Sequence, residues 1–258
     1  MNPTIARQLE HRTIREFTDV PLTEEERRTL LEVANHTATS TGQQSYSILR
    51  ITDKALRQEL AKVAGQEYLA RVPELFVFIV DVYRNARIAE EKGQKDLVAA
   101  RDMDRFFQGF TDGCLAAQNL TVAAESMGLG CVYFGSLLND ASRVIELLEL
   151  PELTFPIVGV GVGHPNQEPQ LKPRMELEYK VFENTYPKGP KSYLEALKDY
   201  DETMRTYYDL RNANRRVDSF TDQVVSRLLA RNVTRSRLVP VIVNQGFLLE
   251  LEGEGRAR

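Results

Sequence analysis

The chain has 258 residues, of which 42% are hydrophobic and 27% charged, a composition typical of globular proteins and unlike that of disordered, collagen-like or coiled-coil chains. Its formal net charge of −4 provides no overall basic field, so we expect neither a nucleic acid nor a membrane surface as its partner.

The first regular element that the sequence predicts is a helix that begins at Thr23 and runs to about Thr37. Glu26 stands three residues after the threonine, which is the spacing of a capping box. Residues 46–52 are rich in β-forming side chains and predict a strand. Residues 53–65 start with an aspartate, end with a glycine and repeat apolar side chains at helical spacing, so they predict a second helix.

The middle of the chain contains its most apolar segments. The run Leu75–Val82 predicts a strand that is covered on both faces and lies in the middle of a sheet. It is much shorter than the roughly 20 residues of a membrane-spanning helix. The polar residues 84–95 predict a mobile surface connection. Residues 104–127 have small or apolar side chains on nearly every face, which indicates a helix that is central or buried in a subunit interface.

The remaining elements suggest a layered core followed by a helical extension. Residues 130–134 and 157–162 predict strands, and residues 140–148 predict a short helix between them. This alternation of strands and helices favours an α+β or α/β core, and taken alone it suggests a parallel sheet. After Arg174 the sequence becomes charged, rich in tyrosine and helical. We therefore expect a core over residues 1–175 and, within the same domain, a helical arm over residues 176–258.

The cysteines and histidines do not form a metal site or a disulfide framework. Cys114 and Cys131 lie in apolar surroundings without a CxxC pair, which favours reduced, packed thiols. His11, His36 and His164 are too far apart for a known zinc motif, and the spacings of serine-nucleophile and P-loop motifs are absent. The amino terminus lacks the apolar core of a secretory signal. We expect a cytoplasmic protein without a metal.

The most informative short segment spans residues 11–15. It contains His11, Arg12, Thr13 and Arg15, so every polar side chain in it can donate a hydrogen bond. At about 100° per residue of helix, the histidine and both arginines share one face, and such a face suits a phosphate. The alternative is a charged turn that only faces water.

Three other segments also have both a functional and a structural interpretation. Lys172 and Arg174 flank a proline that restrains the backbone, which favours a site over an exposed basic pair. Residues 37–44 are rich in hydroxyls and amides, so they can line an anion or a heteroaromatic ring or can simply end a helix. The glycines of Gly159–Gly163 fall within and just after a strand rather than before a helix, which indicates close backbone packing and not a dinucleotide fingerprint.

Four segments together resemble the nitroreductase family, in the same order and at similar separations. Within that family the chain is most similar to the oxygen-insensitive NADPH nitroreductases and the NADPH–flavin oxidoreductases, and the similarity covers nearly the whole chain. The segments are HRTIREFTDVPL at 11–22, TSTGQQSYSILRITD at 39–53, AAESMGLGCVYFGSLLND at 123–140 and GVGVGHPNQEPQLKPR at 159–174. The resemblance implies an α+β nitroreductase-like fold with a mainly antiparallel central sheet flanked by helices. It also implies an intertwined homodimer with a helical C-terminal arm and with FMN at the subunit interface.

The resemblance also implies which residues contact FMN. Donors to the phosphate and ribityl groups, and to the pyrimidine edge of the flavin, would be His11, Arg12, Thr13, Arg15, Lys172 and Arg174. A loop that lines the flavin of the same subunit or of the other one would contribute Thr39, Ser40 and Gln44. The polar edge and one side of the ring would be lined by Gln66, Tyr68, Tyr133, Phe134, Gly135 and Ser136, with the backbone N–H of Gly135 close to flavin N5.

The implied activity follows from the cofactor, and no catalytic side chain is expected. NADPH or NADH would reduce the flavin and leave. A small-molecule acceptor such as a nitroaromatic, a quinone or a free flavin would then take the two electrons in a ping-pong cycle. Arg211, Arg215 and Arg216 would bind the NADPH 2′-phosphate, or they would only be a solvated helix end. The alternatives are a dedicated flavin reductase that releases reduced flavin and a non-enzymatic flavin-binding sensor.

Overall fold

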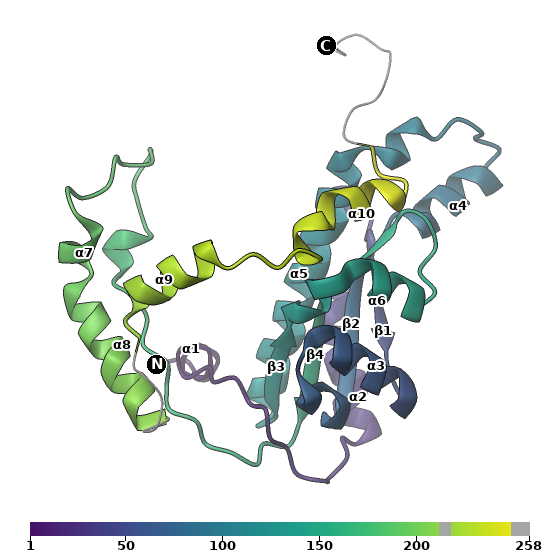
Figure 1. Ribbon diagram of the computed structural model, residues 1–258. Helices are drawn as coiled ribbons and strands as arrows, with labels where there is room; N and C mark the ends of the chain where they lie inside the picture. The colour runs from purple at the N-terminus through teal and green to yellow at the C-terminus, as the bar shows by residue number, and fades with distance from the viewer. Residues whose placement is uncertain (212–217, 249–258) are drawn as a thin grey trace. The chain divides into compact units, whose positions relative to one another are not determined.

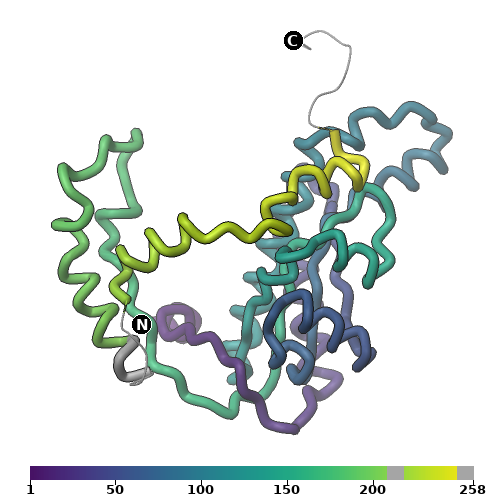
Figure 2. The backbone as a smooth tube through the Cα atoms, viewed as in Figure 1, coloured from purple at the N-terminus to yellow at the C-terminus, as the bar shows by residue number. Residues whose placement is uncertain are grey.

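The computed structural model describes residues 1–211 and 218–248, with the side chains of residues 208–211 left aside. The described chain forms two compact units (Figure 1). One unit consists of Met1–Pro169 together with the segment that begins at Val233, and the other consists of Gln170–Asn232. The chain thus returns to the first unit near its end, in the segment that contains α10 (Leu238–Asn244), which is yellow in the backbone trace (Figure 2).

A four-stranded antiparallel sheet forms the centre of the first unit. Its strands are β1 (Tyr46–Arg50), β2 (Glu74–Asp81), β3 (Gly130–Phe134) and β4 (Thr154–Gly163), in the order β1-β2-β4-β3. The parallel arrangement suggested by alternation alone is wrong, and the antiparallel sheet implied by the resemblance is confirmed. Every residue of β2 is buried, which confirms its expected place inside the sheet.

Helices cover both faces of this sheet (Figure 1). On one face lie α2 (Glu24–Asn35) and α5 (Met103–Ser126), packed against each other and, through α5, against β2 and β4. On the other face lie α3 (Lys54–Ala64) and α6 (Ala141–Leu147). The first unit is therefore a three-layer helix–sheet–helix sandwich with an apolar cluster on each side of the sheet.

The ends of these helices are set by the residues that the sequence analysis singled out. Thr23 caps α2 by accepting a hydrogen bond from the N–H of Glu26, and the Glu26 carboxylate accepts one from the N–H of Thr23, so the capping box is confirmed. Asp53 accepts a hydrogen bond from the N–H of Leu56 at 2.7 Å and starts α3. Gly65 ends α3 with φ of +62°, a backbone conformation that glycine adopts at little cost.

Aromatic side chains join α5 to the end of the chain. Phe106 on α5 contacts Phe155 of β4 and Phe247, with ring centroids 5.4 Å and 5.2 Å away. Phe247 follows α10 (Leu238–Asn244) and is fully buried. This packing explains why the last described residues belong to the first unit although they follow the helical extension.

Two parts of the first unit differ from the sequence analysis. Residues 84–95 were expected to be a mobile connection, but α4 (Tyr83–Glu91) covers most of them. The helix forms because Asp81 accepts a hydrogen bond from the N–H of Arg84 at 3.0 Å and Ala86 is buried, and a polar sequence alone does not reveal either interaction. A short helix, α1 (Pro3–Leu9), was not predicted at all.

The glycines of β4 permit close packing, as the sequence analysis proposed. A Cβ atom added at Gly161 would lie 2.8 Å from Cγ1 of Val72. At Gly163 it would lie 2.5 Å from Cγ of Pro73. These positions therefore admit only hydrogen, and the interpretation of close backbone packing is confirmed.

The second unit is helical. It contains α7 (Tyr193–Ala196), α8 (Lys198–Arg211) and α9 (Phe220–Leu229). Asp201 of α8 accepts two hydrogen bonds from Thr221 at the start of α9, at 3.0 Å from its N–H and 2.5 Å from its hydroxyl. Short 3-10 helices of both units are Ser40–Gly42, Glu67–Arg71, Val98–Arg101, Gly135–Asp140, Leu177–Tyr179 and Arg235–Arg237. Among the described helices, none has both the length and the apolar character needed to cross a bilayer.

Candidate functional site

The residues of segment 11–15 lie along the outer edge of β3. Thr13 pairs in parallel with Cys131, and the N–H of Ile14 donates to the Cys131 carbonyl at 2.9 Å. The side chain of Ile14 is buried against Gly130, where an added Cβ would come within 2.7 Å of it. The segment is therefore extended, and the shared helical face expected for its three cationic side chains is wrong. Pairing with the sheet edge outweighs the local helical alternative.

A second interaction holds the other end of this segment. The side-chain oxygen of Gln167 accepts hydrogen bonds from the N–H of Arg15 at 2.8 Å and of Glu16 at 2.7 Å. Gln167 belongs to the family-like segment at 159–174, but no role was predicted for it. One amide thus fixes two consecutive backbone groups of a candidate cofactor segment that lies about 150 residues away in the chain.

His11 is paired with a carboxylate from α5. Its Nδ1 lies 2.5 Å from Oε1 of Glu125. The Glu125 side chain is 10% exposed and that of His11 33%, so the contact is partly shielded from water. Glu125 belongs to the family-like segment at 123–140, but the sequence analysis gave it no function.

Arg12 has a buried donor without an acceptor. Its Nη1 donates to the carbonyl of Glu10 at 3.1 Å, whereas Nε is buried and has no hydrogen-bond partner. A buried N–H of a guanidinium group that lacks a partner is costly, because the group has lost water without gaining an acceptor. An anionic oxygen from a bound ligand would remove that cost, so this donor fits a phosphorylated cofactor.

The turn after β3 brings together several residues that the resemblance implied. The hydroxyl of Ser136 donates to Oε1 of Gln66 at 2.8 Å. The rings of Tyr68 and Phe134 lie 5.6 Å apart, and the Phe134 side chain is fully buried, so it offers a ligand only its backbone. A Cβ added at Gly135 would meet no atom within 4 Å. The space beside Gly135 is therefore open.

Tyr133 points toward α5. Its hydroxyl accepts from Thr121 at 2.8 Å and lies 3.1 Å from Oε1 of Gln118, to which it donates. Burial raises the pKa of Tyr133 to about 12. The phenol therefore stays neutral near pH 7, and its hydrogen bonds are directed to α5.

Arg235, which was not predicted as a site residue, also contacts this turn. Nη1 of Arg235 donates to the carbonyl of Gly135 at 2.9 Å and to Oδ1 of Asn139 at 3.3 Å. This contact places a cation at the turn after β3, from a segment that follows the helical extension. Its signal in the sequence was only a pair of arginines in a stretch interpreted as helical.

The loop that contains Thr39, Ser40 and Gln44 is strained and anchored to α5. Oδ1 of Asp112 accepts from the N–H of Ser40 at 2.8 Å, and its Oδ2 is buried without a partner. Thr41 and Gln44 both have φ of +51°, which is uncommon for residues other than glycine and especially for a β-branched one. Such strain often marks ligand-binding sites.

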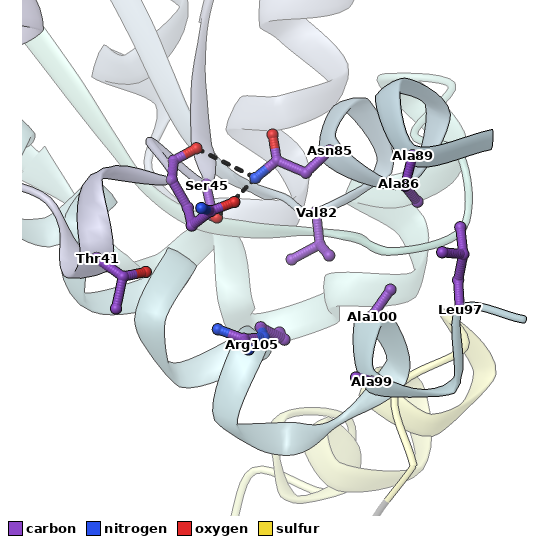
Figure 3. A pocket seen from close by; sticks show the side chains of 11 residues that line it. Thr41, Ser45, Val82, Asn85, Ala86, Ala89, Leu97, Ala99, Ala100 and Arg105 are labelled. Atoms are coloured by element: carbon purple, nitrogen blue, oxygen red, sulfur yellow. Dashed lines mark hydrogen bonds between the residues drawn. The ribbon is translucent and has the colours of Figure 1, made fainter. Parts of the chain in front are cut away.

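A cavity of about 380 Å³ adjoins the same loop (Figure 3). Thr41 and Arg105 lie at its wall, with the small side chains of Ala86 and Ala100. Asn85 bridges the loop to α4, because its Nδ2 donates to the Ser45 hydroxyl and to the neighbouring Gln43 carbonyl, each at 3.1 Å. The loop is therefore held from α4 as well as from α5.

The remaining candidate residues belong to the second unit. Nη1 of Arg174 donates to the carbonyl of Lys172 at 2.8 Å, which ties the guanidinium to its own backbone segment. The side chain of Arg211, and the whole of Arg215 and Arg216, lie outside the described residues.

Comparisons with known proteins agree over nearly the whole chain. The model of the nitroreductase family matches residues 9–164, and that of the nitroreductase family C-terminal domain matches residues 172–250. An FMN reductase (NADPH) of Bacillus subtilis is 37% identical over 96% of this chain and 99% of its own length. An NADPH-flavin oxidoreductase of Vibrio harveyi is 38% identical, and an oxygen-insensitive NADPH nitroreductase of Salmonella typhimurium 37%, both with the same coverage.

Solved structures agree with these relatives. The NfrA1 nitroreductase of B. subtilis has a TM-score of 0.88 at 36% identity, covering 95% of this chain and 98% of that one. The NADPH:FMN oxidoreductase of V. harveyi in complex with NAD+ has a TM-score of 0.82 at 37% identity, with the same coverage of both chains.

Proposed function

The chain belongs to the nitroreductase family, and from that premise we propose that it is an FMN-dependent NAD(P)H oxidoreductase that reduces small-molecule acceptors by two electrons. The relatives named above act on flavins or nitro compounds with NADPH, as their names say. Bound FMN supplies a ring that accepts a hydride from NADPH and passes two electrons to a nitroaromatic, a quinone or a flavin.

The observation that carries this proposal is the unpaired, buried Nε of Arg12. It lies in a segment that also contains His11, Thr13 and Arg15, and hydrogen bonds hold that segment against β3 and Gln167. We propose that these four side chains donate to the phosphate, the ribityl chain and the pyrimidine edge of FMN. Positive charge near that edge stabilises the negative charge of the reduced ring.

The turn after β3 would contact the redox-active part of the cofactor. The open space beside Gly135 allows a flat ring to approach the backbone, and the N–H of this residue would donate to flavin N5. The Ser136–Gln66 hydrogen bond orients the amide of Gln66 for the polar edge of the ring, with Tyr68 close by. The backbone of the preceding residues, 133–134, would run beside the flavin.

Two further sets of residues that the resemblance implied would complete the cofactor contacts. We propose that Lys172 and Arg174 also neutralise the phosphate, because one dianion can accept hydrogen bonds from several cations. Thr39, Ser40 and Gln44 would line the flavin of the partner subunit.

Homodimer formation is supported by the exposed face of α5. Phe107 is 60% exposed and Leu115 48% exposed, and these residues lie on one side of the helix with Thr111 between them. Cys114 is exposed beside them. Large apolar side chains that line one face of a helix and remain exposed are typical of a surface that another protein covers. We propose that a second copy of the chain covers it.

Arg211, Arg215 and Arg216 would bind the 2′-phosphate of NADPH, with Arg211 as the principal contact. A cluster of arginines distinguishes this phosphate from the hydroxyl of NADH. Arg211→Ala should therefore reduce the preference for NADPH over NADH in steady-state kinetics. An unchanged preference would exclude this assignment.

We also place the reaction in the cytoplasm, where NADPH is available and where thiols such as Cys114 and Cys131 stay reduced.

The direct test uses the purified protein. It should be yellow, bind FMN in equal amounts to protein chains, and lose its visible absorbance when NADPH is added without oxygen. Admission of a nitroaromatic or a quinone should restore the absorbance. Colourless protein that takes up no FMN would overturn the proposal, and bound flavin that never turns over would instead indicate a flavin-binding sensor.

A dedicated flavin reductase is the second candidate, because the similar relatives include both a flavin reductase and a nitroreductase at the same identity. The two activities differ in how readily reduced flavin leaves the site. A dedicated flavin reductase should have a much higher kcat/KM for free FMN or FAD than for nitroaromatics. Comparable values would favour the broader oxidoreductase.

A further inference from the structure

The contact between His11 and Glu125 joins two parts of the fold that are 114 residues apart in sequence. Glu125 lies in the last turn of α5 and is 8% exposed as a residue, with Oε1 at 2.5 Å from His11 Nδ1. A carboxylate in such a place requires a hydrogen-bond donor, since burial without one is costly. His11 provides that donor.

This hydrogen bond constrains the proton positions of the imidazole. An ionised carboxylate only accepts hydrogen bonds, so the proton of the contact sits on Nδ1 of His11. The other nitrogen, Nε2, is then left to interact with a ligand, either as an acceptor or, in the doubly protonated ring, as a donor. A partner at one ring nitrogen determines what the other nitrogen can do.

We propose that Glu125 is the positioning residue of the cofactor site: it holds the His11 ring in one orientation with a proton on Nδ1, so that Nε2 faces the phosphate or ribityl oxygens of FMN. This inference rests on the proposed function, which supplies the ligand. Glu125 itself does not touch the cofactor, and it acts only through His11.

Glu125 lies close to two ionisable side chains of β3. Its negative charge adds to the effect of burial in raising the pKa values of Cys131 and Tyr133, both on β3 beside it. Both therefore stay neutral near pH 7, and neither adds a second negative charge to that of Glu125. Arg12, the adjacent cationic residue, donates to the carbonyl of Glu10.

The test combines a spectroscopic measurement with cofactor affinity. The chain has three histidines, so side-chain ¹⁵N–¹H NMR of histidine-labelled protein can assign His11 by comparison with a His11→Ala sample. In the wild type, Nδ1 should carry the proton. In Glu125→Ala the proton of His11 should no longer be held on Nδ1. FMN binding should weaken about 10–100-fold, as loss of such an orienting partner does at metal sites. Glu125→Gln retains an acceptor and should restore both values to nearly those of the wild type.

Two further variants separate positioning from a general structural effect. Glu146→Ala removes an exposed carboxylate on α6 and should leave FMN affinity unchanged. In a His11→Ala background, Glu125→Ala should have almost no additional effect on affinity, because the positioning residue then has nothing to position. An equal loss in both backgrounds, or an unaltered His11 spectrum in Glu125→Ala, would overturn the inference. The spectra do not need flavin, so failure of the wild type to bind FMN would count against the proposed function alone.

Discussion

At the scale of single residues, hydrogen bonding separates structural arginines from those available to a ligand. Arg57 donates to three backbone carbonyls, those of Ile51 and Val72 at 2.7 Å and that of Pro73 at 3.3 Å. Its guanidinium group thus donates to the backbone from all three of its nitrogen atoms. Arg12, in contrast, keeps a buried Nε without an acceptor. The sequence alone does not distinguish the two arginines, so this distinction had to come from the structure.

Arg12→Ala should therefore lower FMN affinity, whereas Arg57→Ala should lower the stability of the fold. Arg12→Ala removes a donor to the proposed phosphate and should weaken FMN binding by about 1.5–3 kcal/mol, the range for hydrogen bonds to charged groups, with little loss of stability. Arg57→Ala leaves three carbonyls without a donor and should lower the free energy of unfolding by about 1–3 kcal/mol. Flavin fluorescence titration and urea denaturation measure the two effects. If both variants lost affinity equally, the assignment of Arg12 would be wrong.

Gly135 offers a similar comparison with Gly163. An alanine at 135 meets no atom within 4 Å, so Gly135→Ala should leave the stability of the flavin-free protein unchanged. It should still weaken FMN binding, because the added methyl occupies the space proposed for the ring. Gly163→Ala brings a Cβ to 2.5 Å from Pro73 and should lower the free energy of unfolding by about 1–3 kcal/mol. Unchanged FMN affinity in Gly135→Ala would place the ring elsewhere.

At the scale of secondary-structure elements, the sequence predicted best where a local interaction decides the conformation. The box at Thr23, the cap at Asp53 and the glycine at 65 depend only on near neighbours, and all three were predicted correctly. Segment 11–15 was wrongly assigned to a helical face because its conformation depends on pairing with β3, more than 100 residues later. Helix α4 was missed because Asp81, which accepts a hydrogen bond from the N–H of Arg84, is also the last residue of β2 and was assigned to that strand alone.

Glu74 connects three of these elements and gives a pH-dependent prediction. At the start of β2, it accepts two hydrogen bonds from Arg50 of β1, at 2.7 Å and 2.8 Å, and one from Arg27 of α2 at 3.3 Å. Burial alone would favour the neutral acid, but these arginines lower the pKa of Glu74 below its ordinary value. The stability that its charge provides is therefore present above the ordinary pKa and is lost as the pH falls through the lowered one.

Glu74→Gln should accordingly lower the free energy of unfolding by about 1–3 kcal/mol at pH 7. The difference from the wild type should shrink as the pH falls below about 4, because the wild-type carboxyl then also becomes neutral. Urea denaturation at several pH values measures it, with the exposed Glu146→Gln as control. A difference that stays constant down to pH 3 would show that the charge of Glu74 is not responsible.

At the scale of the whole molecule, the family resemblance supplied what local patterns could not. Alternating strands and helices suggested a parallel sheet, and only the resemblance gave the antiparallel arrangement that the structure has. The candidate residues of the first unit were named from motifs, but the residues that hold them were not. Glu125, Gln167 and Asp112 orient His11, Arg15 and Ser40 through contacts across 72 to 152 positions of the chain. Such contacts have no short-range pattern and were therefore missed.

The exposed face of α5 leads to the prediction for the assembly. If a second copy covers Phe107 and Leu115, Leu115→Glu places a charge without a partner in the interface and should convert the dimer to monomers. The monomer should fold, because the Leu115 side chain is not part of the core, but it should bind FMN weakly, since the proposed site includes the loop of the partner subunit. Light scattering after size-exclusion chromatography gives the mass, and flavin titration gives the affinity.

The control is Ile88→Glu, which also places a glutamate at an exposed apolar position, on α4, and should remain dimeric. A Leu115→Glu protein that stays dimeric would move the interface away from α5, and a monomer with full FMN affinity would show that each chain completes its own site.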